Sequence, residues 1–128
     1  MSKFKSQGFR KTFRNARKGL RLVIKSERNI RVHFLAGTLA LLSALFLGLS
    51  ILEICIVMIS IGLVVGFEML NSAIEFALDA VFHNRYSTLV GMAKDISAGA
   101  VMFATFIAIF VGLFIFVPPI YNLISSKF

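Results

Sequence analysis

Residues 54–78 read ICIVMISIGLVVGFEMLNSAIEFAL, an apolar run whose first charged residue is Glu68. A helix rises about 1.5 Å per residue, so a run of this length crosses the ~30 Å hydrocarbon core of a bilayer. Residues 34–52 and 96–117 form two further apolar runs that are long enough to do the same. The sequence therefore predicts an all-α integral membrane protein with three transmembrane helices.

The composition supports this fold class. Of the 128 residues, 58% are hydrophobic and 16% are charged. A soluble domain of this size could not bury so much apolar surface, so an ordinary globular protein is excluded. The single cysteine, Cys55, excludes an intramolecular disulfide and a zinc site built from cysteines.

The basic residues indicate the orientation in the membrane. The chain has 14 lysines and arginines against 6 acidic residues, and most of the basic ones precede residue 34. Cytoplasmic segments of membrane proteins carry such an excess, so no nucleic-acid partner is needed to explain it and we expect none. By the same rule we expect a multi-pass protein of the cell membrane, with its N-terminus and the polar loop at residues 80–95 in the cytoplasm.

The segment before the first run is amphipathic. Its apolar residues recur every three or four positions and basic residues fill the rest of the helical wheel, as in a helix that lies on a membrane surface. The apolar positions are Phe9, Phe13, Ala16, Leu20, Val23 and Ile24. We expect two units, a basic surface helix within residues 1–33 and a transmembrane domain at residues 34–128.

The connections between the runs differ in length and polarity. Residues 49–53 are almost all that separates the first run from the second, which predicts a tight antiparallel hairpin. Residues 80–95 form the only connection with enough polar side chains to meet a soluble ligand. Pro118 and Pro119 follow the third run, and we expect them to end its helix because proline lacks the backbone donor.

Three carboxylates lie where the second run should still be in the membrane or at its inner boundary. An acid at the centre of a transmembrane helix costs about 2.5–3.5 kcal/mol, so such residues indicate a function. At about 100° per residue the polar side chains share one face of the helix. They are Glu68, Asn71, Ser72, Glu75 and Asp79. The stripe predicts either a site or a structural polar seam between helices.

The depth of each acid suggests its task. Glu68 lies deeper and is the candidate base, whereas Glu75 lies nearer the cytoplasm and is the candidate ligand of a hard cation such as Mg²⁺. Glu27, the only acid in the basic segment, is a second candidate ligand or else an exposed helix charge. Lys94 stands at the cytoplasmic edge of the third run, where it either contacts phosphate or extends its amine to the interface.

The run EMLNSAIE at residues 68–75, followed by AKD at residues 93–95, resembles the small prokaryotic diacylglycerol kinase family. The resemblance covers about residues 18–117 and includes KGLR at residues 18–21, Glu27 and Arg31. KSERN at residues 25–29, leading to His33, is similar to the Gram-positive branch of the family, which phosphorylates undecaprenol.

This resemblance implies a homotrimer in a bacterial cell membrane, with active sites shared between neighbouring subunits. It implies transfer of the ATP γ-phosphate, with Mg²⁺, to the hydroxyl of a membrane lipid, either undecaprenol or, as the alternative, diacylglycerol. Glu68 then matches the proton acceptor and Asn71 lies beside the reacting centre. The remaining matches are Glu27 and Glu75 for the ATP-bound magnesium, Tyr86, Lys94 and Asp95 for the nucleotide, and Arg31 for the lipid pocket.

The polar loop departs from the family pattern. Members commonly have an acid before the tyrosine and a histidine after it, whereas this chain has Arg85 and Ser87. The resemblance therefore assigns no nucleotide contact to these two positions and leaves open whether they make one. A different class, a non-enzymatic and holin-like membrane assembly protein, would use the polar stripe to line a seam or a pore.

Overall fold

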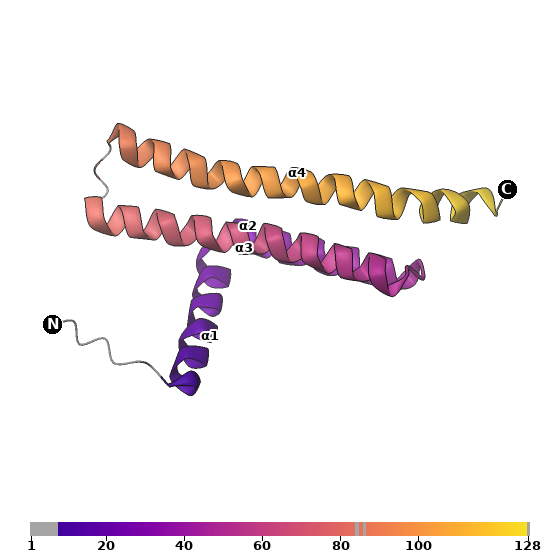
Figure 1. Ribbon diagram of the computed structural model, residues 1–128, viewed down its shortest axis with the longest axis horizontal. Coiled ribbons are helices and arrows are strands. Elements are labelled where there is room, and N and C mark those ends of the chain that lie inside the picture. The colour runs from indigo at the N-terminus through magenta and orange to yellow at the C-terminus, as the bar shows by residue number, and fades with distance from the viewer. Residues whose placement is uncertain (1–7, 84, 86, 128) are drawn as a thin grey trace.

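The structure is a computed structural model that describes residues 8–83, 85 and 87–127. In these residues the helices are α1 (Phe9–Ser26), α2 (Arg28–Phe46), α3 (Ile51–Phe82) and α4 (Thr88–Ser125). The helices α2, α3 and α4 form a bundle, and α1 projects away from it (Figure 1). Each helix of the bundle is long and apolar enough to cross a membrane. The predicted class, three transmembrane helices preceded by an amphipathic helix, is confirmed.

The chain turns sharply between α1 and α2. Glu27 adopts an extended conformation with φ −101° and ψ 118°, so α1 ends before it and α2 begins directly after it. The Arg31 guanidinium donates hydrogen bonds to the carbonyl oxygens of Ile24 and Lys25, at 3.0 and 3.1 Å. These bonds satisfy carbonyls that have no partner at the end of a helix. Residues 28–33 therefore form the first turns of α2 and not the end of the surface helix.

A tight hairpin joins α2 to α3, as predicted. Gly48 has φ 66°, a left-handed conformation that residues with a Cβ atom disfavour. Ser50 and Glu53 form a capping box at the start of α3, in which the Ser50 backbone N–H donates to Glu53 Oε2 at 2.7 Å. The two helices approach closely at Gly37. A Cβ atom at this position would lie only 2.7 Å from Ile61 Cγ2.

The helices α3 and α4 are longer than a membrane requires. With 32 and 38 residues, they extend about 48 and 57 Å against a hydrocarbon core of ~30 Å. Their ends beside the connecting loop extend beyond the junction of α1 and α2 (Figure 1). The polar loop is consequently shorter than predicted, because Lys94 and Asp95 lie in α4. The Ser87 hydroxyl caps α4 by accepting from the Val90 N–H at 3.2 Å.

The expectation that Pro118 and Pro119 end the third helix is wrong. The helix α4 continues through both prolines to Ser125. Their fixed φ of about −65° suits a helix, and what they remove is the backbone donor to the carbonyls of Phe114 and Ile115. Apolar transmembrane helices tolerate this loss when local adjustments satisfy the freed groups.

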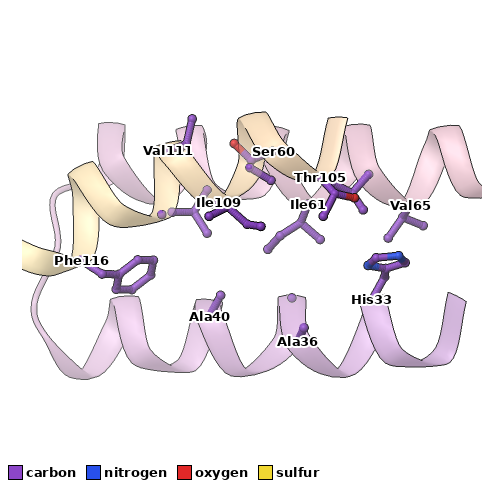
Figure 2. Close-up of a pocket in the computed structure, with 15 residues that line it drawn as sticks. His33, Ala36, Ala40, Ser60, Ile61, Val65, Thr105, Ile109, Val111 and Phe116 are labelled. Atoms are coloured by element: carbon purple, nitrogen blue, oxygen red, sulfur yellow. The ribbon is translucent and has the colours of Figure 1, made fainter. Parts of the chain in front are cut away.

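Little of the chain is buried within a single copy. Ile30 and Ala44 are fully buried, whereas large side chains such as Phe103 and Phe114 are 67% and 80% exposed. In lipid, apolar side chains need no protein cover, so this exposure fits a membrane environment. A cavity of about 220 Å³ remains between α2, α3 and α4, with His33 near one end and Phe116 near the other (Figure 2).

Candidate active site

A second cavity, of about 320 Å³, lies where the polar stripe of α3 faces α2 and residues 98–102 of α4. Its lining residues are Asn29, His33, Glu68, Asn71, Glu75, Ala98, Val101 and Met102. Three members of the predicted stripe therefore line one cavity. The stripe residue Ser72 is 4% exposed, and its hydroxyl donates to the Glu68 carbonyl oxygen at 3.1 Å. We call this space the polar cavity.

Glu68 is the most deeply buried acid of the stripe. Its side chain is only 5% exposed although it lines the polar cavity. In the part of the chain that the structure describes, no residue donates a hydrogen bond to its carboxylate. A carboxylate within an apolar membrane helix is costly, and such groups mark proton-transfer or binding sites. The position of Glu68 therefore agrees with a functional carboxylate at the wall of the polar cavity.

Asn71 joins the carboxylate of Glu75 to α4. The Asn71 amide donates to Glu75 Oε1 at 2.9 Å, and its carbonyl oxygen accepts from the Ser97 hydroxyl at 2.5 Å. The Ser97 hydroxyl also contacts the Lys94 carbonyl oxygen at 3.0 Å. These bonds fix the rotamers of Asn71 and Glu75, so one carboxylate edge is held in place at the cavity wall.

Ser97 was not singled out by the sequence. It lies three residues after Lys94 and hence on the same face of α4. That spacing was the only signal that could have identified it. The pairing with Asn71 depends on how α3 and α4 are aligned, which spacing along one helix does not give.

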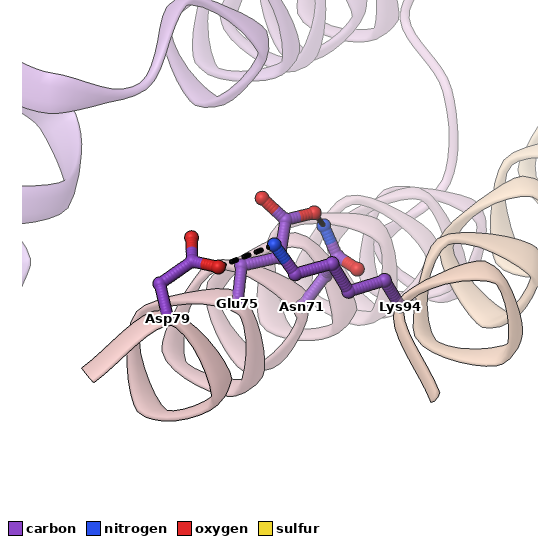
Figure 3. A network of polar contacts seen from close by, with 4 residues as sticks. All are labelled: Asn71, Glu75, Asp79 and Lys94. Atoms are coloured by element: carbon purple, nitrogen blue, oxygen red, sulfur yellow. Dashed lines mark hydrogen bonds and ion pairs between the residues drawn. The ribbon is translucent and has the colours of Figure 1, made fainter. Parts of the chain in front are cut away.

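Lys94 pairs with the last acid of the stripe. Its ammonium Nζ donates to Asp79 Oδ1 at 2.6 Å, and Figure 3 shows it reaching from α4 to α3 beside Glu75. The two side chains are 34% and 41% exposed, so the pair contributes little to stability, at most about 1 kcal/mol. An ammonium has three donors, and among the described residues only Asp79 accepts from this one, so the ammonium can also donate to an anion.

Other predicted residues lie outside the polar cavity. Glu27 occupies the turn between α1 and α2 and does not line that cavity in the described part of the chain. Arg31 bonds to the end of α1, so its observed contacts hold the turn between the helices. Asp95 is exposed on α4. Tyr86 lies outside the described residues. The functional roles of all four stay predictions.

Of the two departures from the family pattern, Ser87 has a structural role and the Arg85 side chain has none assigned. Ser87 caps α4 through its hydroxyl. Arg85 is exposed, and its backbone N–H donates to the Phe82 carbonyl oxygen at 2.8 Å. His83 ends α3 in a left-handed conformation with φ 50°. These contacts form the turn and leave the Arg85 side chain without an assigned task.

The carboxylate oxygens at the polar cavity fit a hard cation that is bound together with phosphate. Within residues 8–83, 85 and 87–127, no three His, Cys, Asp or Glu side chains form a cluster that could hold a metal ion alone. Mg²⁺ commonly takes one or two protein carboxylates and completes its shell with phosphate oxygens and water. Glu75, whose second oxygen accepts no bond from a described residue, can supply such a ligand.

Asn29 and His33 of α2 are also part of the polar cavity, although neither was predicted as a site residue. They are four residues apart and so share one face of α2. His33 has no partner at metal-binding spacing in the sequence, so the sequence pattern does not mark it as a ligand. Its place opposite Glu68 depends on the packing of α2 against α3, which the sequence pattern did not reveal.

Together, the fold and the site define a class, a helical membrane protein with a cavity of carboxylates between its apolar helices and a partly exposed lysine beside it. Residues 14–116 match the family described as prokaryotic diacylglycerol kinase. That match covers most of the chain, and the chain belongs to this family.

Three relatives illustrate the range of the family. Undecaprenol kinase of Bacillus subtilis is 35% identical over 112 residues, which is 88% of this chain and 90% of that protein. Diacylglycerol kinase of Synechocystis is 32% identical over 112 residues, which is 88% of this chain but only 64% of that protein. Diacylglycerol kinase of Escherichia coli is 35% identical over 92 residues, 72% of this chain and 75% of that protein.

The family and the names of these relatives identify lipid kinases of prokaryotic membranes, which perform nucleotide-dependent phosphate transfer. Membership therefore favours the enzymatic interpretation of the polar stripe over the holin-like one. The three apolar helices agree with a bacterial membrane protein. The acceptor lipid and the roles of individual residues are not fixed by the family name.

Proposed function

We propose that this protein transfers the γ-phosphate of ATP to the hydroxyl of undecaprenol. The observation that carries the proposal is the polar cavity, which the buried Glu68 carboxylate lines together with Glu75 and Asn71, between helices long enough to cross a membrane. A lipid acceptor and a water-soluble nucleotide have to meet at such an interface. The undecaprenol kinase of Bacillus subtilis, with 90% of its length matched, supports this choice of acceptor.

In this mechanism Glu68 removes the proton from the acceptor hydroxyl. The hydroxyl oxygen forms a bond to the γ-phosphorus while the bond from that phosphorus to the bridging oxygen of ADP breaks, and the proton stays on Glu68. The transition state of phosphate transfer requires positioning and charge stabilisation more than covalent chemistry. Asn71, fixed between Glu75 and Ser97, lies beside the reacting atoms.

The nucleotide binds at the water-facing end. Glu75 and Glu27 would hold Mg²⁺, which neutralises charge on the ATP phosphates when bound. Lys94 supplies positive charge near the phosphates, and Asp95 and Tyr86 contact the rest of the nucleotide. Glu27 approaches from the turn between α1 and α2, so in this proposal that turn brings the surface helix to the nucleotide.

The same proposal includes orientation and assembly. The N-terminus and the loop at residues 80–95 face the cytoplasm, where ATP is found, and α1 lies on the membrane surface. Three copies form a trimer in which neighbouring subunits complete each site. The extensive exposure of apolar side chains in one copy is compatible with contacts between copies as well as with lipid.

Phosphate transfer from ATP, measured with purified protein in detergent, tests the proposal. Undecaprenol and diacylglycerol are offered side by side, and Glu68→Gln serves as the blank. We expect faster transfer to undecaprenol. Preference for diacylglycerol, the acceptor named for the Synechocystis and Escherichia coli relatives, would replace the proposed acceptor with the alternative. Absence of transfer to either lipid, from folded protein, would overturn the proposed activity.

A further inference from the structure

The 220 Å³ cavity between α2, α3 and α4 has no task in the mechanism above. We call it the apolar cavity, because most of its lining is aliphatic or aromatic. From α4 it is lined between Thr105 and Phe116, and from α2 between His33 and Ala40. At 1.5 Å per residue, the α4 lining extends about 16 Å along the bundle, away from the polar end.

His33 lines both cavities. Its ring is partly buried and points from α2 into the space between the helices, near Val65 of α3 (Figure 2). Glu68 lies about one helical turn from Val65 and lines the polar cavity together with His33. The imidazole therefore stands where a polar space that contains carboxylates meets a space lined by hydrocarbon.

The apolar cavity offers few free hydrogen-bond donors. The Ser60 hydroxyl donates to the Ile56 carbonyl oxygen at 2.9 Å, and the Thr105 hydroxyl donates to the Val101 carbonyl oxygen at 2.9 Å. Both hydroxyl protons are thus already used within their own helices. A carbonyl group placed in this cavity would lose its hydrogen-bond donors, which is unfavourable.

The apolar cavity can select between lipid chains, but the hydrophobic effect does not drive a chain into it. The chain of a membrane lipid is already out of water, so its transfer into the apolar cavity gains little from the hydrophobic effect. The cavity can still discriminate, because it accommodates an uninterrupted hydrocarbon and penalises ester groups. Diacylglycerol carries two esters close to its hydroxyl, whereas a polyprenol has a hydrocarbon chain attached directly to the carbinol carbon.

We propose that His33 binds the hydroxyl of the acceptor lipid at the junction of the two cavities, and that the apolar cavity holds the first part of the acceptor's hydrocarbon chain. This inference rests on the proposed lipid kinase function. One ring nitrogen of the imidazole hydrogen-bonds the acceptor oxygen, and Glu68 then takes the proton from the same hydroxyl. His33 thus becomes an acceptor-binding residue that favours a polyprenol over a diacylglycerol.

Steady-state kinetics of the purified full chain with undecaprenol and ATP test His33 directly. Loss of one hydrogen bond in His33→Phe should raise the KM for undecaprenol about tenfold, equivalent to about 1.4 kcal/mol, with the KM for ATP changed less than about twofold. His33→Gln retains hydrogen-bonding groups and should recover most of the loss. Val32→Phe, at a neighbouring exposed position, is the matched control and should leave both constants unchanged.

A second pair of variants tests the chain site. Ala36 lines the apolar cavity, so Ala36→Phe should fill it and raise the KM for undecaprenol without changing the KM for ATP. Leu35→Phe, at a residue that is 63% exposed, is its control. If the wild type transfers phosphate but His33→Phe leaves the KM for undecaprenol unchanged, or raises both constants equally, the inference is wrong while the lipid kinase function stands. If the wild type transfers phosphate to no lipid, the proposed function itself fails.

Discussion

The two ends of α3 carry acidic side chains that are bonded in different ways. At one end, the Glu53 carboxylate accepts bonds from the Ser50 backbone N–H and hydroxyl, at 2.7 and 2.6 Å, three residues away. At the other end, Asp79 bonds to Lys94 of a different helix. Between them, Glu68 is buried against a cavity. The first acid completes a helix terminus, whereas the acids of the polar stripe are not required by the helix that contains them.

Among these substitutions, Glu68→Gln should cause the largest loss of activity, because it changes the polar stripe and leaves the Glu53 cap intact. Removing a positioned base lowers turnover by about 10²–10⁴-fold, and the neutral amide occupies the same volume, so assembly should be retained. The measurement is the kcat for lipid phosphorylation at saturating ATP and Mg²⁺, together with gel filtration in detergent. A kcat within about tenfold of wild type would show that Glu68 is not the base.

Glu75→Gln should act on the metal requirement. The variant loses a charged ligand, and we expect the Mg²⁺ concentration for half-maximal activity to rise by about tenfold or more. A titration of activity with Mg²⁺ at fixed ATP measures this. The hydrogen bond from Asn71 can persist with the glutamine oxygen, so the fold should tolerate the change. An unchanged Mg²⁺ dependence would remove Glu75 from the metal site.

Lys94→Ala should have a smaller and nucleotide-specific effect. Loss of one charge-assisted contact to phosphate should raise the KM for ATP about tenfold, with the KM for lipid unchanged. Lys127→Ala, at the far end of the chain, is the control for loss of one positive charge. Asp79→Asn breaks the same ion pair from the other side, and an effect on ATP as large as that of Lys94→Ala would indicate that the pair, and not phosphate binding, explains the result.

Ser50→Ala should produce the smallest effect and act on stability alone. It removes the cap of α3, where the Ser50 hydroxyl accepts from the Glu53 N–H at 3.3 Å, so the helix terminus should fray. We expect a slightly lower melting temperature in detergent and unchanged kinetic constants. A clear loss of turnover would mean that this end of α3 also contributes to the site.

The sequence predicted the features that depend on one helix at a time. Apolar run lengths gave three spans and the tight hairpin, and the 100° periodicity placed Glu68, Asn71 and Glu75 on one face. The contacts between helices were not predictable in this way. His33 faces Glu68 only because α2 packs against α3 in one register, which Gly37 and Ile61 permit by close approach.

Helix boundaries were the least predictable part of the fold. Residues 28–33 are polar enough to suggest the surface segment, yet the Arg31 contacts to α1 place the turn at Glu27. Pro118 and Pro119 suggested an end that the structure does not have. In both cases local sequence preferences gave way to contacts or to an apolar environment that sequence spacing does not describe.

The most direct test of this comparison is the initial rate of phosphate transfer from ATP to undecaprenol by Glu53→Gln and Glu68→Gln, purified in parallel with the wild type. Both substitutions remove one negative charge from α3. We predict transfer near the wild-type rate for Glu53→Gln and none above background for Glu68→Gln. Equal rates for the two variants would contradict the assignment of the reaction to the polar stripe.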